Sequence, residues 1–486
     1  MTNPYDREPM MEVPSPSRPL SVARHLMDTT FSDNGTPTLV RWHKHYWAYN
    51  GTCWTLKDPE QVCGDLYRTL ENAYYLDKDG DRKDFNPDPK KISNVTATLN
   101  IVAAEPALGV GTMPAWLGDG PAWYSPTTGQ LVDPGDPRDY VAVTNGILNW
   151  KTRALRPHSP GFFSHFALPY AYDAEATAPE WENFLHTIFE HDPKAIDLIQ
   201  EYCGYLVSGA TNRHKALLLI GPPRAGKGTL SRIIQRLIGA ENTTSPTLGS
   251  LGSRFGLAEL VGKTLAVLED ARDSEHLHRS TTVERLLSII GEDPVPVEQK
   301  GKDFVTMRLP VRFMIVSNET PRFNDASGAI ATRFLPVELM KSFLGKEDIH
   351  LEEKLSREMP GILNWALDGL ARLEAQQGFT VPDTSEELSE EIQATASPLI
   401  LFFRDTERFI LTGSDEDYVA LRDVHRVYRL WCDEAGMRPF GQVEFGKKVN
   451  ASPVDVRVKN TVPEEGMKKN RYIFRLREDR GAWNAA

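Results

Sequence analysis

The segment from Gly221 to Thr229 carries the residue types best suited to chemistry. It follows a short apolar stretch at 215–220 and precedes a helical pattern over 230–237. A glycine-rich loop between a strand and a helix lets backbone N–H groups surround phosphate oxygens, and the helix N-terminus adds partial positive charge. The spacing therefore predicts a P-loop that binds a nucleotide, formed by Gly221, Pro222, Pro223, Arg224, Ala225, Gly226, Lys227, Gly228 and Thr229.

Two side chains of this loop have expected roles toward ATP and Mg²⁺. Lys227 is placed to reach the β- and γ-phosphates of ATP. A Ser or Thr usually follows this lysine and binds Mg²⁺, but the chain has Gly228 at that position. We therefore expect the hydroxyl of Thr229 to serve the metal.

Two further apolar stretches end in polar residues. Residues 264–268 are followed by Glu269 and Asp270, which suits a Walker B strand whose carboxylates bind Mg²⁺ and polarise the attacking water. The sequence does not separate the roles of these two acids. Residues 312–317 lead to Asn318, which suits a sensor of the γ-phosphate or the water. Ligands of parallel sheets gather at the carboxyl ends of the strands, so these groups should meet there.

The elements that position these residues follow from the pattern of the whole chain. Strands and helices alternate over 209–373, which predicts an α/β ATPase core with a largely parallel sheet. We expect an α+β domain over 20–208 and a small helical and β domain over 392–486. A proline-rich stretch at 1–19 indicates a disordered tail, and an acidic stretch at 374–391 indicates a linker.

Composition narrows the class of protein. The chain has 486 residues, 55 Lys and Arg against 67 Asp and Glu, and a net charge of −12. That balance argues against a surface that wraps duplex DNA by bulk charge. Six of the acids lie in the linker, which has no base. No apolar run reaches the ~18 residues of a membrane span, and the four cysteines form no CxxC pair, so we expect a cytosol-like compartment.

The order of the motifs resembles superfamily 3 helicases, and more narrowly the phage and plasmid primase-helicases related to the poxvirus primase-helicase. The resemblance covers roughly Asn145 to Arg477. Beyond the motor motifs it includes Asn145-Gly-Ile-Leu148, Pro157-His-Ser-Pro160, Glu201-Tyr-Cys-Gly204-Tyr-Leu and Gly361-Ile-Leu-Asn-Trp365-Ala. Many relatives have paired arginines where this chain has Thr332-Arg333.

The resemblance implies a hexameric AAA+-like ring that hydrolyses ATP between subunits and moves along single-stranded DNA, typically 3′→5′. It implies that Gly226, Lys227 and Thr229 bind ATP and Mg²⁺, and that Glu269 and Asp270 are the acidic pair. It implies further that Asn318 is the sensor and Arg333 the arginine finger. A phage or mobile-element protein of this kind would work in the bacterial cytoplasm, with a primase or polymerase as a further partner.

Candidate DNA contacts lie in two places. Alternating apolar residues flank Lys300-Gly-Lys302, which predicts a β-hairpin with a basic tip; in the family such a hairpin grips backbone phosphates in the ring channel. The segment 421–486 has a net charge of +5 and a pattern that resembles a winged helix. Its candidate phosphate contacts are Lys447, Lys448, Arg457 and Lys459. The aromatic residues at 42–54 favour a small core over a base-stacking platform.

Two other functions remain open from the sequence. A P-loop nucleotide kinase is one, since Lys-Gly-Thr also occurs in adenylate-kinase-like loops. The other is an origin-binding or scaffold protein that uses ATP only to assemble. We expect no primer synthesis by this chain alone, because about 100 residues between the tail and the resembling region carry no convincing catalytic carboxylate strand.

Overall fold

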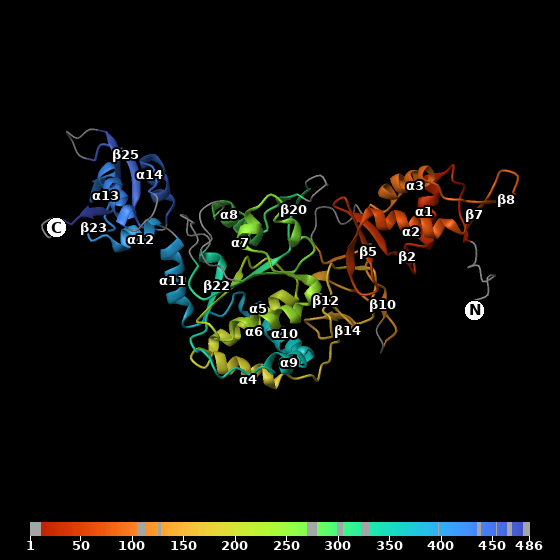
Figure 1. Ribbon diagram of the computed structural model, residues 1–486, viewed down its shortest axis with the longest axis horizontal. Coiled ribbons are helices and arrows are strands. Elements are labelled where there is room, and N and C mark those ends of the chain that lie inside the picture. The colour runs from red at the N-terminus through yellow and green to blue at the C-terminus, as the bar shows by residue number, and fades with distance from the viewer. Residues whose placement is uncertain are drawn as a thin grey trace.

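The computed structural model describes residues 11–104, 113–124, 128–269, 279–298, 305–321, 331–396, 398–434, 439–452, 454–463 and 469–479. The ribbon is elongated, with the N-terminal elements at one end, a parallel sheet in the centre and the C-terminal elements at the other end (Figure 1). Within the described residues, no helix has both the length and the apolar character needed to cross a bilayer.

The N-terminal part combines helices with small sheets that are antiparallel except for the pairing of its first strand. Its helices are α1 (Pro19–Thr29), α2 (Pro59–Glu71) and α3 (Pro89–Val102). Its strands are β1 (Met11–Glu12), β2 (Ser32–Asp33), β3 (Thr36–Pro37), β4 (Leu39–Trp42), β5 (His45–Tyr49), β6 (Trp54–Lys57), β7 (Ala73–Leu76) and β8 (Arg82–Asp84). The helix α2 begins with a capping box in which the Asp58 side chain accepts from the N–H of Glu60.

The expected disordered tail differs from the structure from Met11 onward. The strand β1 pairs in parallel with β7, with Met11 opposite Ala73. Val13 is buried in the core that α1, α2 and α3 share. This pairing joins segments about 60 residues apart in sequence, so the local proline content did not reveal it.

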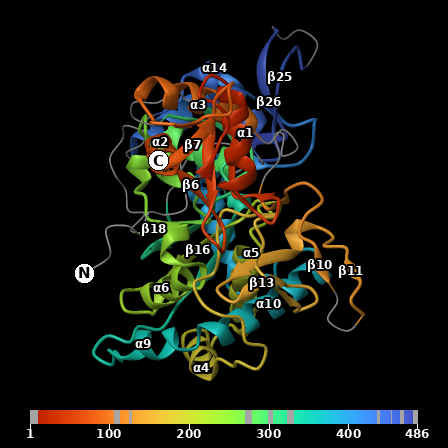
Figure 2. The ribbon, with the colours of Figure 1, turned by 90° about the vertical axis from the view of Figure 1, so that its right-hand side faces the viewer.

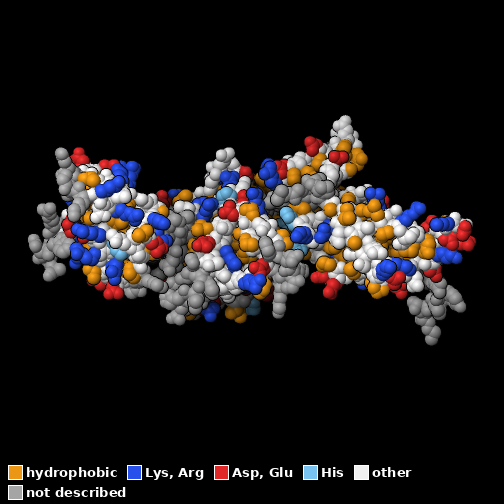
Figure 3. Space-filling view, turned by 90° about the horizontal axis from the view of Figure 1, so that it is seen from above, with side chains coloured by type: hydrophobic (Ala, Val, Ile, Leu, Met, Phe, Trp, Pro, Cys, Tyr) orange, Lys and Arg blue, Asp and Glu red, His pale blue; other side chains and the backbone are white. Residues whose placement is uncertain are grey.

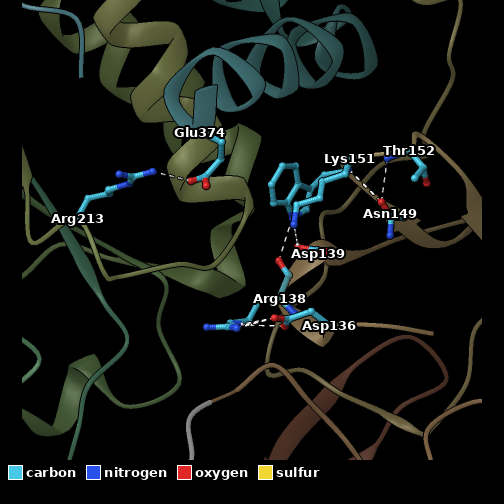
Figure 4. A network of polar contacts seen from close by, with 9 residues as sticks. Asp136, Arg138, Asp139, Asn149, Lys151, Thr152, Arg213 and Glu374 are labelled. Atoms are coloured by element: carbon cyan, nitrogen blue, oxygen red, sulfur yellow. Dashed lines mark hydrogen bonds and ion pairs between the residues drawn. The ribbon is translucent and has the colours of Figure 1, made fainter. Parts of the chain in front are cut away.

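A β-rich region connects the N-terminal part to the centre. Its strands are β9 (Ala115–Trp116), β10 (Trp123–Tyr124), β11 (Leu131–Val132), β12 (Tyr140–Val143), β13 (Gly146–Asn149), β14 (Leu155–Arg156) and β15 (Phe162–Phe163). Polar contacts hold the turn regions around β12 and β13 (Figure 4). The Trp150 indole donates to the carbonyl of Arg138 at 2.9 Å, and Lys151 pairs with Asp139 at 2.6 Å.

The centre of the molecule is a five-stranded parallel sheet, which confirms the α/β prediction. Its order is β17-β18-β21-β16-β22. The strands are β16 (Ala216–Ile220), β17 (Thr243–Thr244), β18 (Leu265–Glu269), β21 (Arg312–Ser317) and β22 (Phe334–Glu338). The three strands β16, β18 and β21 are nearly continuous apolar runs, as expected for strands buried on both faces.

Helices cover both faces of this sheet (Figures 1 and 2). One face packs on α4 (Pro179–Ile188), α5 (Pro193–Val207), α6 (Lys227–Ile238), α9 (Leu351–Ser356) and α10 (Met359–Gln376). The other face packs on α7 (Leu248–Gly252), α8 (Arg279–Ile290) and α11 (Ser385–Ala396). Successive residues of β16 alternate between these two cores, with Leu217 and Leu219 in the first and Leu218 and Ile220 in the second.

The acidic segment 374–391, expected as a linker, is largely helical and packed. It contains the end of α10 and more than half of α11. Leu388 and Ile392 lie four positions apart on α11 and are buried in the second core of the sheet. The Ser385 hydroxyl donates to the carbonyl of Pro336 in β22 at 2.5 Å. The glutamates occupy the remaining faces of the helix, which is why the composition alone indicated a linker.

The C-terminal part has its own apolar core. Its helices are α12 (Pro398–Asp405), α13 (Leu421–Glu434) and α14 (Gln442–Ala451). Its strands are β23 (Phe409–Leu411), β24 (Tyr418–Ala420), β25 (Arg457–Thr461), β26 (Asn470–Phe474) and β27 (Leu476–Glu478). The sheet β24-β26-β25 is antiparallel, with Val458 opposite Ile473. Two helices followed by a two-stranded hairpin match the order that the sequence predicted here.

Candidate functional site

The predicted P-loop lies between β16 and α6. Gly226 is the residue before α6 and has φ +96°, a left-handed conformation that glycine adopts without strain. At the other end of the loop, a Cβ on Gly221 would lie 2.2 Å from the carbonyl oxygen of Leu339. Both glycines are thus required by the backbone, and α6 begins at Lys227 as the motif predicts.

The Lys227 side chain folds back over the loop. Its ammonium donates to the carbonyls of Gly221 at 2.5 Å and Pro222 at 2.8 Å, and to the side-chain oxygen of Asn318 at 3.0 Å. All three acceptors are uncharged. The side chain is buried, and this burial lowers the pKa of Lys227. The site therefore holds a desolvated cation whose three acceptors carry no charge.

The two neighbouring strands bring their polar ends to the same edge. In the sheet, Ile220 of β16 is opposite Ser317 of β21, and Val316 is opposite Glu269 of β18. Glu269 and Asn318 are exposed, while the strands before them are buried. The structure thus brings together Lys227, Glu269 and Asn318 at the carboxyl edge of the sheet. The second predicted acid, Asp270, lies outside the described residues.

Two residues in the first turn of α6, Gly228 and Thr229, differ in burial. Thr229 is half-buried, whereas Gly228 is exposed. A Cβ on Gly228 would meet only the end of the Arg232 side chain, at 3.1 Å from Nη1. A side chain could therefore be accommodated at 228 by a shift of that arginine.

A segment that the sequence did not indicate braces the loop. The N–H of Leu339 donates to the carbonyl of Ile220 at 2.8 Å, and the N–H of Phe343 donates to that of Arg224 at 2.9 Å. The Ser342 hydroxyl donates to the carbonyl of Pro223 at 2.9 Å. These bonds hold the carbonyl side of the loop, and they leave its N–H groups for another acceptor. No sequence motif marks this segment, because its contacts are made through the backbone and one serine.

Arg333 lies at the amino ends of the parallel strands, whereas Lys227 lies at their carboxyl ends. It precedes Phe334, which is opposite Ala216, the first residue of β16. The P-loop follows the last residue of that strand, so the length of β16, five residues or about 17 Å, separates Arg333 from the start of the P-loop. The neighbouring Lys215 donates to the carbonyl of Thr332 at 2.5 Å. Burial, and then repulsion from Arg333, lowers the pKa of Lys215.

The predicted basic hairpin has the expected flanking strands. β19 (Val295–Val297) pairs antiparallel with β20 (Val305–Met307), with Val297 opposite Val305. Its tip residues Lys300 and Lys302 lie outside the described residues.

The C-terminal candidates differ from one another in their partners. Lys447 and Arg457 are exposed. Lys448 lies 3.9 Å from the carboxylate of Glu444, and Lys459 lies 3.2 Å from that of Asp415. Figure 3 shows Lys and Arg side chains over this part of the surface, at the left of the view. The sequence predicted that all four residues contact phosphates. In the structure, Lys448 and Lys459 already have acidic neighbours.

Two of the resembling motifs outside the motor pack against each other. The motif from Glu201 lies in α5, and the motif from Gly361 lies in α10. A Cβ on Gly204 would lie 2.4 Å from the carbonyl oxygen of Ala366, so the glycine permits this close helix contact. The Gln200 amide donates to the carbonyl of Trp365 at 2.8 Å. These motifs therefore pack α5 on α10 and support the sheet from one side.

Comparison with known proteins gives two family matches. Residues 38–190 match the family described as D5 N terminal like. Residues 219–333 match a family of unknown function, DUF5906. The second match runs from β16 to Arg333 and so includes Lys227, Glu269 and Asn318. The first match supports the resemblance to primase-helicases.

Solved structures with which the chain aligns include three whose titles give the same protein region. "The apo structure of NrS-1 C terminal region (305-718)" is 15% identical, with a TM-score of 0.45, over 86% of this chain and 82% of that one. "The A form apo structure of NrS-1 C terminal region-CTR" is 13% identical, with a TM-score of 0.43 and the same coverage. "The A form apo structure of NrS-1 C terminal region-CTR(305-718)" is 14% identical, with a TM-score of 0.48, over 94% of this chain and 99% of that one.

Proposed function

We propose that this protein is an ATP-dependent DNA helicase of the primase-helicase type, which moves 3′→5′ along single-stranded DNA as a ring of six subunits. One observation carries the proposal. The buried Lys227 ammonium sits at the carboxyl edge of a parallel sheet, in a loop shaped by Gly221 and Gly226, and contacts Asn318 on the neighbouring strand. Nucleotide sites of open α/β sheets occupy this position.

The residues present fit the phosphates of ATP. A buried ammonium is costly when its acceptors are neutral, as the three acceptors of Lys227 in the described part of the chain are, and an anionic partner would offset that cost. The N-terminus of α6 offers free N–H groups to the same anion. Lys227 would hold the β- and γ-phosphates, the Thr229 hydroxyl would hold Mg²⁺, and the remaining residues of 221–228 would surround the phosphate chain.

The exposed end of β18 suits the acidic role. Glu269 with Asp270 would bind Mg²⁺ through water and orient the water that attacks the γ-phosphate. Asn318 would contact that phosphate or the water. Because Asn318 shares a hydrogen bond with Lys227, its position depends on whether the lysine turns toward a phosphate.

The place of Arg333 supports hydrolysis between subunits. It lies about 17 Å of strand away from its own P-loop, so as an arginine finger it would act on the nucleotide of a neighbouring subunit. A closed ring provides such a neighbour for every site. In that ring, Lys300 and Lys302 would line the channel, and Lys447, Lys448, Arg457 and Lys459 would add phosphate contacts from a winged-helix-like module.

A strand-displacement assay tests the proposal. Forked DNA with a single 3′ or 5′ tail is incubated with the protein, with and without ATP and Mg²⁺. We expect unwinding only with ATP, only from the 3′ tail, and at least 100-fold less with Lys227→Ala. Lys194→Ala serves as the matched control, because Lys194 is exposed on α5 and pairs with Asp383.

The other outcomes separate the alternative functions. Equal unwinding by Lys227→Ala would contradict the proposal. Phosphoryl transfer from ATP to a nucleotide without DNA would indicate a kinase. ATP binding without turnover, even with single-stranded DNA, would indicate an assembly or scaffold role.

A further inference from the structure

A pocket of about 360 Å³ lies where the N-terminal part meets the central sheet. This volume is within the ~300–1,000 Å³ range of sites for small ligands. Five segments of the chain contribute to it, namely the hairpin of β4 and β5, the residue Met113, the residue His165, the turn before β18, and the hairpin of β19 and β20 with its flanking residues. The lining residues that bear on its chemistry are Trp42, His43, Trp47, His165, Thr306 and Arg308.

The aromatic wall of the pocket is held in place from behind. Trp42 packs edge-on against Phe163, with ring centroids 5.7 Å apart. Phe163 also contacts Trp47 and Trp54, which are buried. The expected small aromatic core thus exists, but Trp42 is only partly buried and lies at its edge. A ring fixed in this way offers a flat surface at a low cost in conformational entropy.

The histidines of the pocket behave as neutral aromatic rings. His43 lies 4.2 Å from the Trp42 ring, centroid to centroid, in an edge-on arrangement. Burial lowers the pKa of His43, and burial together with repulsion from Arg312 lowers the pKa of His165 to about 3. The charged group of the lining is therefore Arg308, which is exposed, and no residue of the lining is acidic.

This combination suits one chemical class of ligand. A flat, apolar, aromatic wall suits a planar ring with a π-face, and an arginine beside it suits a phosphate attached to that ring. The pocket also shares β20 with the basic hairpin, since Thr306 and Met307 both line it. Thr306 is four residues after Lys302, at most about 14 Å of chain, so a strand gripped by the hairpin would pass close to the pocket.

We infer that this pocket takes one base of the single-stranded DNA that the protein translocates along. The base stacks against Trp42, with the His43 ring edge-on beside it, and Arg308 holds an adjoining phosphate. The inference rests on the proposed function, because it adds a contact to a base to the backbone contacts proposed for the same DNA. Base stacking does not depend on charge. A stacking contact would therefore let a protein with a net charge of −12 hold single-stranded DNA with few Lys and Arg side chains.

Matched oligonucleotides test this inference. Fluorescently labelled (dT)₂₀ is compared with a 20-unit abasic strand, which has the same phosphates and no bases. We expect the full-length protein to bind (dT)₂₀ about 10-fold more tightly. Trp42→Ala should remove most of that difference and leave abasic binding unchanged, whereas Arg308→Ala should weaken both strands. Tyr124→Ala is the matched control, because Tyr124 is an exposed aromatic residue of β10 outside the pocket lining.

Photocrosslinking of the unaltered protein covers the case in which Trp42→Ala does not fold. An oligonucleotide that carries 5-iododeoxyuridine is irradiated on the protein, and the adduct is mapped by mass spectrometry. We expect adducts at Trp42, His43 or Trp47, and adducts only at other aromatic residues would overturn the inference. Free thymidine monophosphate should compete weakly, and saturation by it at micromolar concentration would indicate a nucleotide site instead.

The outcomes distinguish the two proposals. Equal affinity of the unaltered protein for (dT)₂₀ and the abasic strand would overturn the base pocket and leave the helicase proposal standing. No binding of either strand, with or without ATP, would contradict the helicase proposal itself.

Discussion

The ammonium of Lys227 lies 3.0 Å from the side-chain oxygen of Asn318, a residue 91 positions later in the chain. The two side chains come from the loop after β16 and the end of the adjacent strand β21, so the sheet itself brings them together. In this arrangement a phosphate that attracts Lys227 also changes the surroundings of Asn318. Through this pair, nucleotide binding at the P-loop would change the contacts at the end of β21.

Replacement of Asn318 by Ala should affect turnover more than binding. Lys227 keeps two carbonyl acceptors, so we expect the affinity for ATP to change less than threefold. The contact to the γ-phosphate or the water is lost, and we expect ATP turnover to fall 10- to 100-fold, or about 1.4–2.7 kcal/mol in the barrier. Steady-state ATPase rates and titration with a fluorescent ATP analogue measure the two effects. Glu319→Gln, at the next exposed position, is the control, and an unchanged rate in Asn318→Ala would contradict the sensor role.

Thr229 gives a second test of the site. If its hydroxyl binds Mg²⁺, Thr229→Ala should lower ATP turnover 10- to 100-fold, while Thr229→Ser should retain most activity because it keeps the hydroxyl. The measurement is the ATPase rate as a function of Mg²⁺ concentration, which should shift to higher Mg²⁺ in Thr229→Ala. Thr187→Ala, at an exposed position of α4, is the control because it removes a hydroxyl outside the loop. Full activity of Thr229→Ala at low Mg²⁺ would exclude this hydroxyl as a ligand.

The buried His165 predicts how stability depends on pH. Its pKa is lowered to about 3, whereas an unfolded histidine titrates near 6.5. The unfolded chain thus binds a proton over pH 6.5 to 3 that the folded chain does not, so the free energy of unfolding falls as the pH falls. Between pH 7 and pH 5 this one group should cost about 2 kcal/mol. Urea unfolding at both pH values measures the loss.

A substitution isolates this contribution from other acid effects. In His165→Gln the loss between pH 7 and pH 5 should be smaller by about 2 kcal/mol, because glutamine does not titrate and can still bond the Thr264 hydroxyl, which His165 contacts at 3.2 Å. His186→Gln, at an exposed position of α4, should keep the dependence of the unaltered protein. The same loss in all three proteins would show that His165 is not responsible.

Local patterns predicted much of the fold. The apolar run that leads to Gly221 forms β16, and the apolar stretches at 264–268 and 312–317 form most of β18 and the whole of β21. Lys227 and Asn318 were expected to meet because parallel strands end at one edge. The bracing bonds of 339–343 to the P-loop could not be predicted, because they link backbone groups more than 100 residues apart. For the same reason the separation of Arg333 from its own P-loop required the register of β22 on β16.

The resembling motif at Glu201 shows a different limit of sequence reasoning. Its residue types could indicate a catalytic acid, but the carboxylate is fully buried and satisfied by structural partners. It accepts from the Arg372 guanidinium at 2.7 Å, and from the Thr380 N–H and hydroxyl at 2.7 Å each. The motif thus joins α5 to α10 and to the segment before α11.

This network predicts a large loss of stability when Glu201 is replaced. Glu201→Ala removes the acceptor of buried donors from Gln376 and Thr380, while Arg372 keeps Asp197 at 3.3 Å. The free energy of unfolding should fall by about 2–4 kcal/mol, measured by urea denaturation. Glu201→Gln keeps an acceptor and should lose less. Glu190→Ala removes an exposed pair with Lys341 and should cost less than about 1 kcal/mol. Similar losses for Glu201→Ala and Glu190→Ala would contradict the structural role.

Arg333 provides the test of hydrolysis between subunits. Lys227→Ala lacks nucleotide binding but keeps its arginine, and Arg333→Ala keeps the P-loop but lacks the proposed finger. Each variant alone should have less than about 1% of the normal ATPase rate, since an arginine finger contributes about 10³–10⁵ in rate.

When the two variants are mixed and assembled together, some interfaces pair an intact P-loop with an intact Arg333, so a measurable fraction of the ATPase rate should return. The fraction should depend on the mixing ratio and be greatest near equal amounts. Lys194→Ala, the exposed control on α5, replaces Arg333→Ala in the control mixture, whose rate should decline in simple proportion to the added Lys227→Ala. If the Lys227→Ala and Arg333→Ala mixture stays inactive while both proteins assemble, Arg333 does not act across an interface.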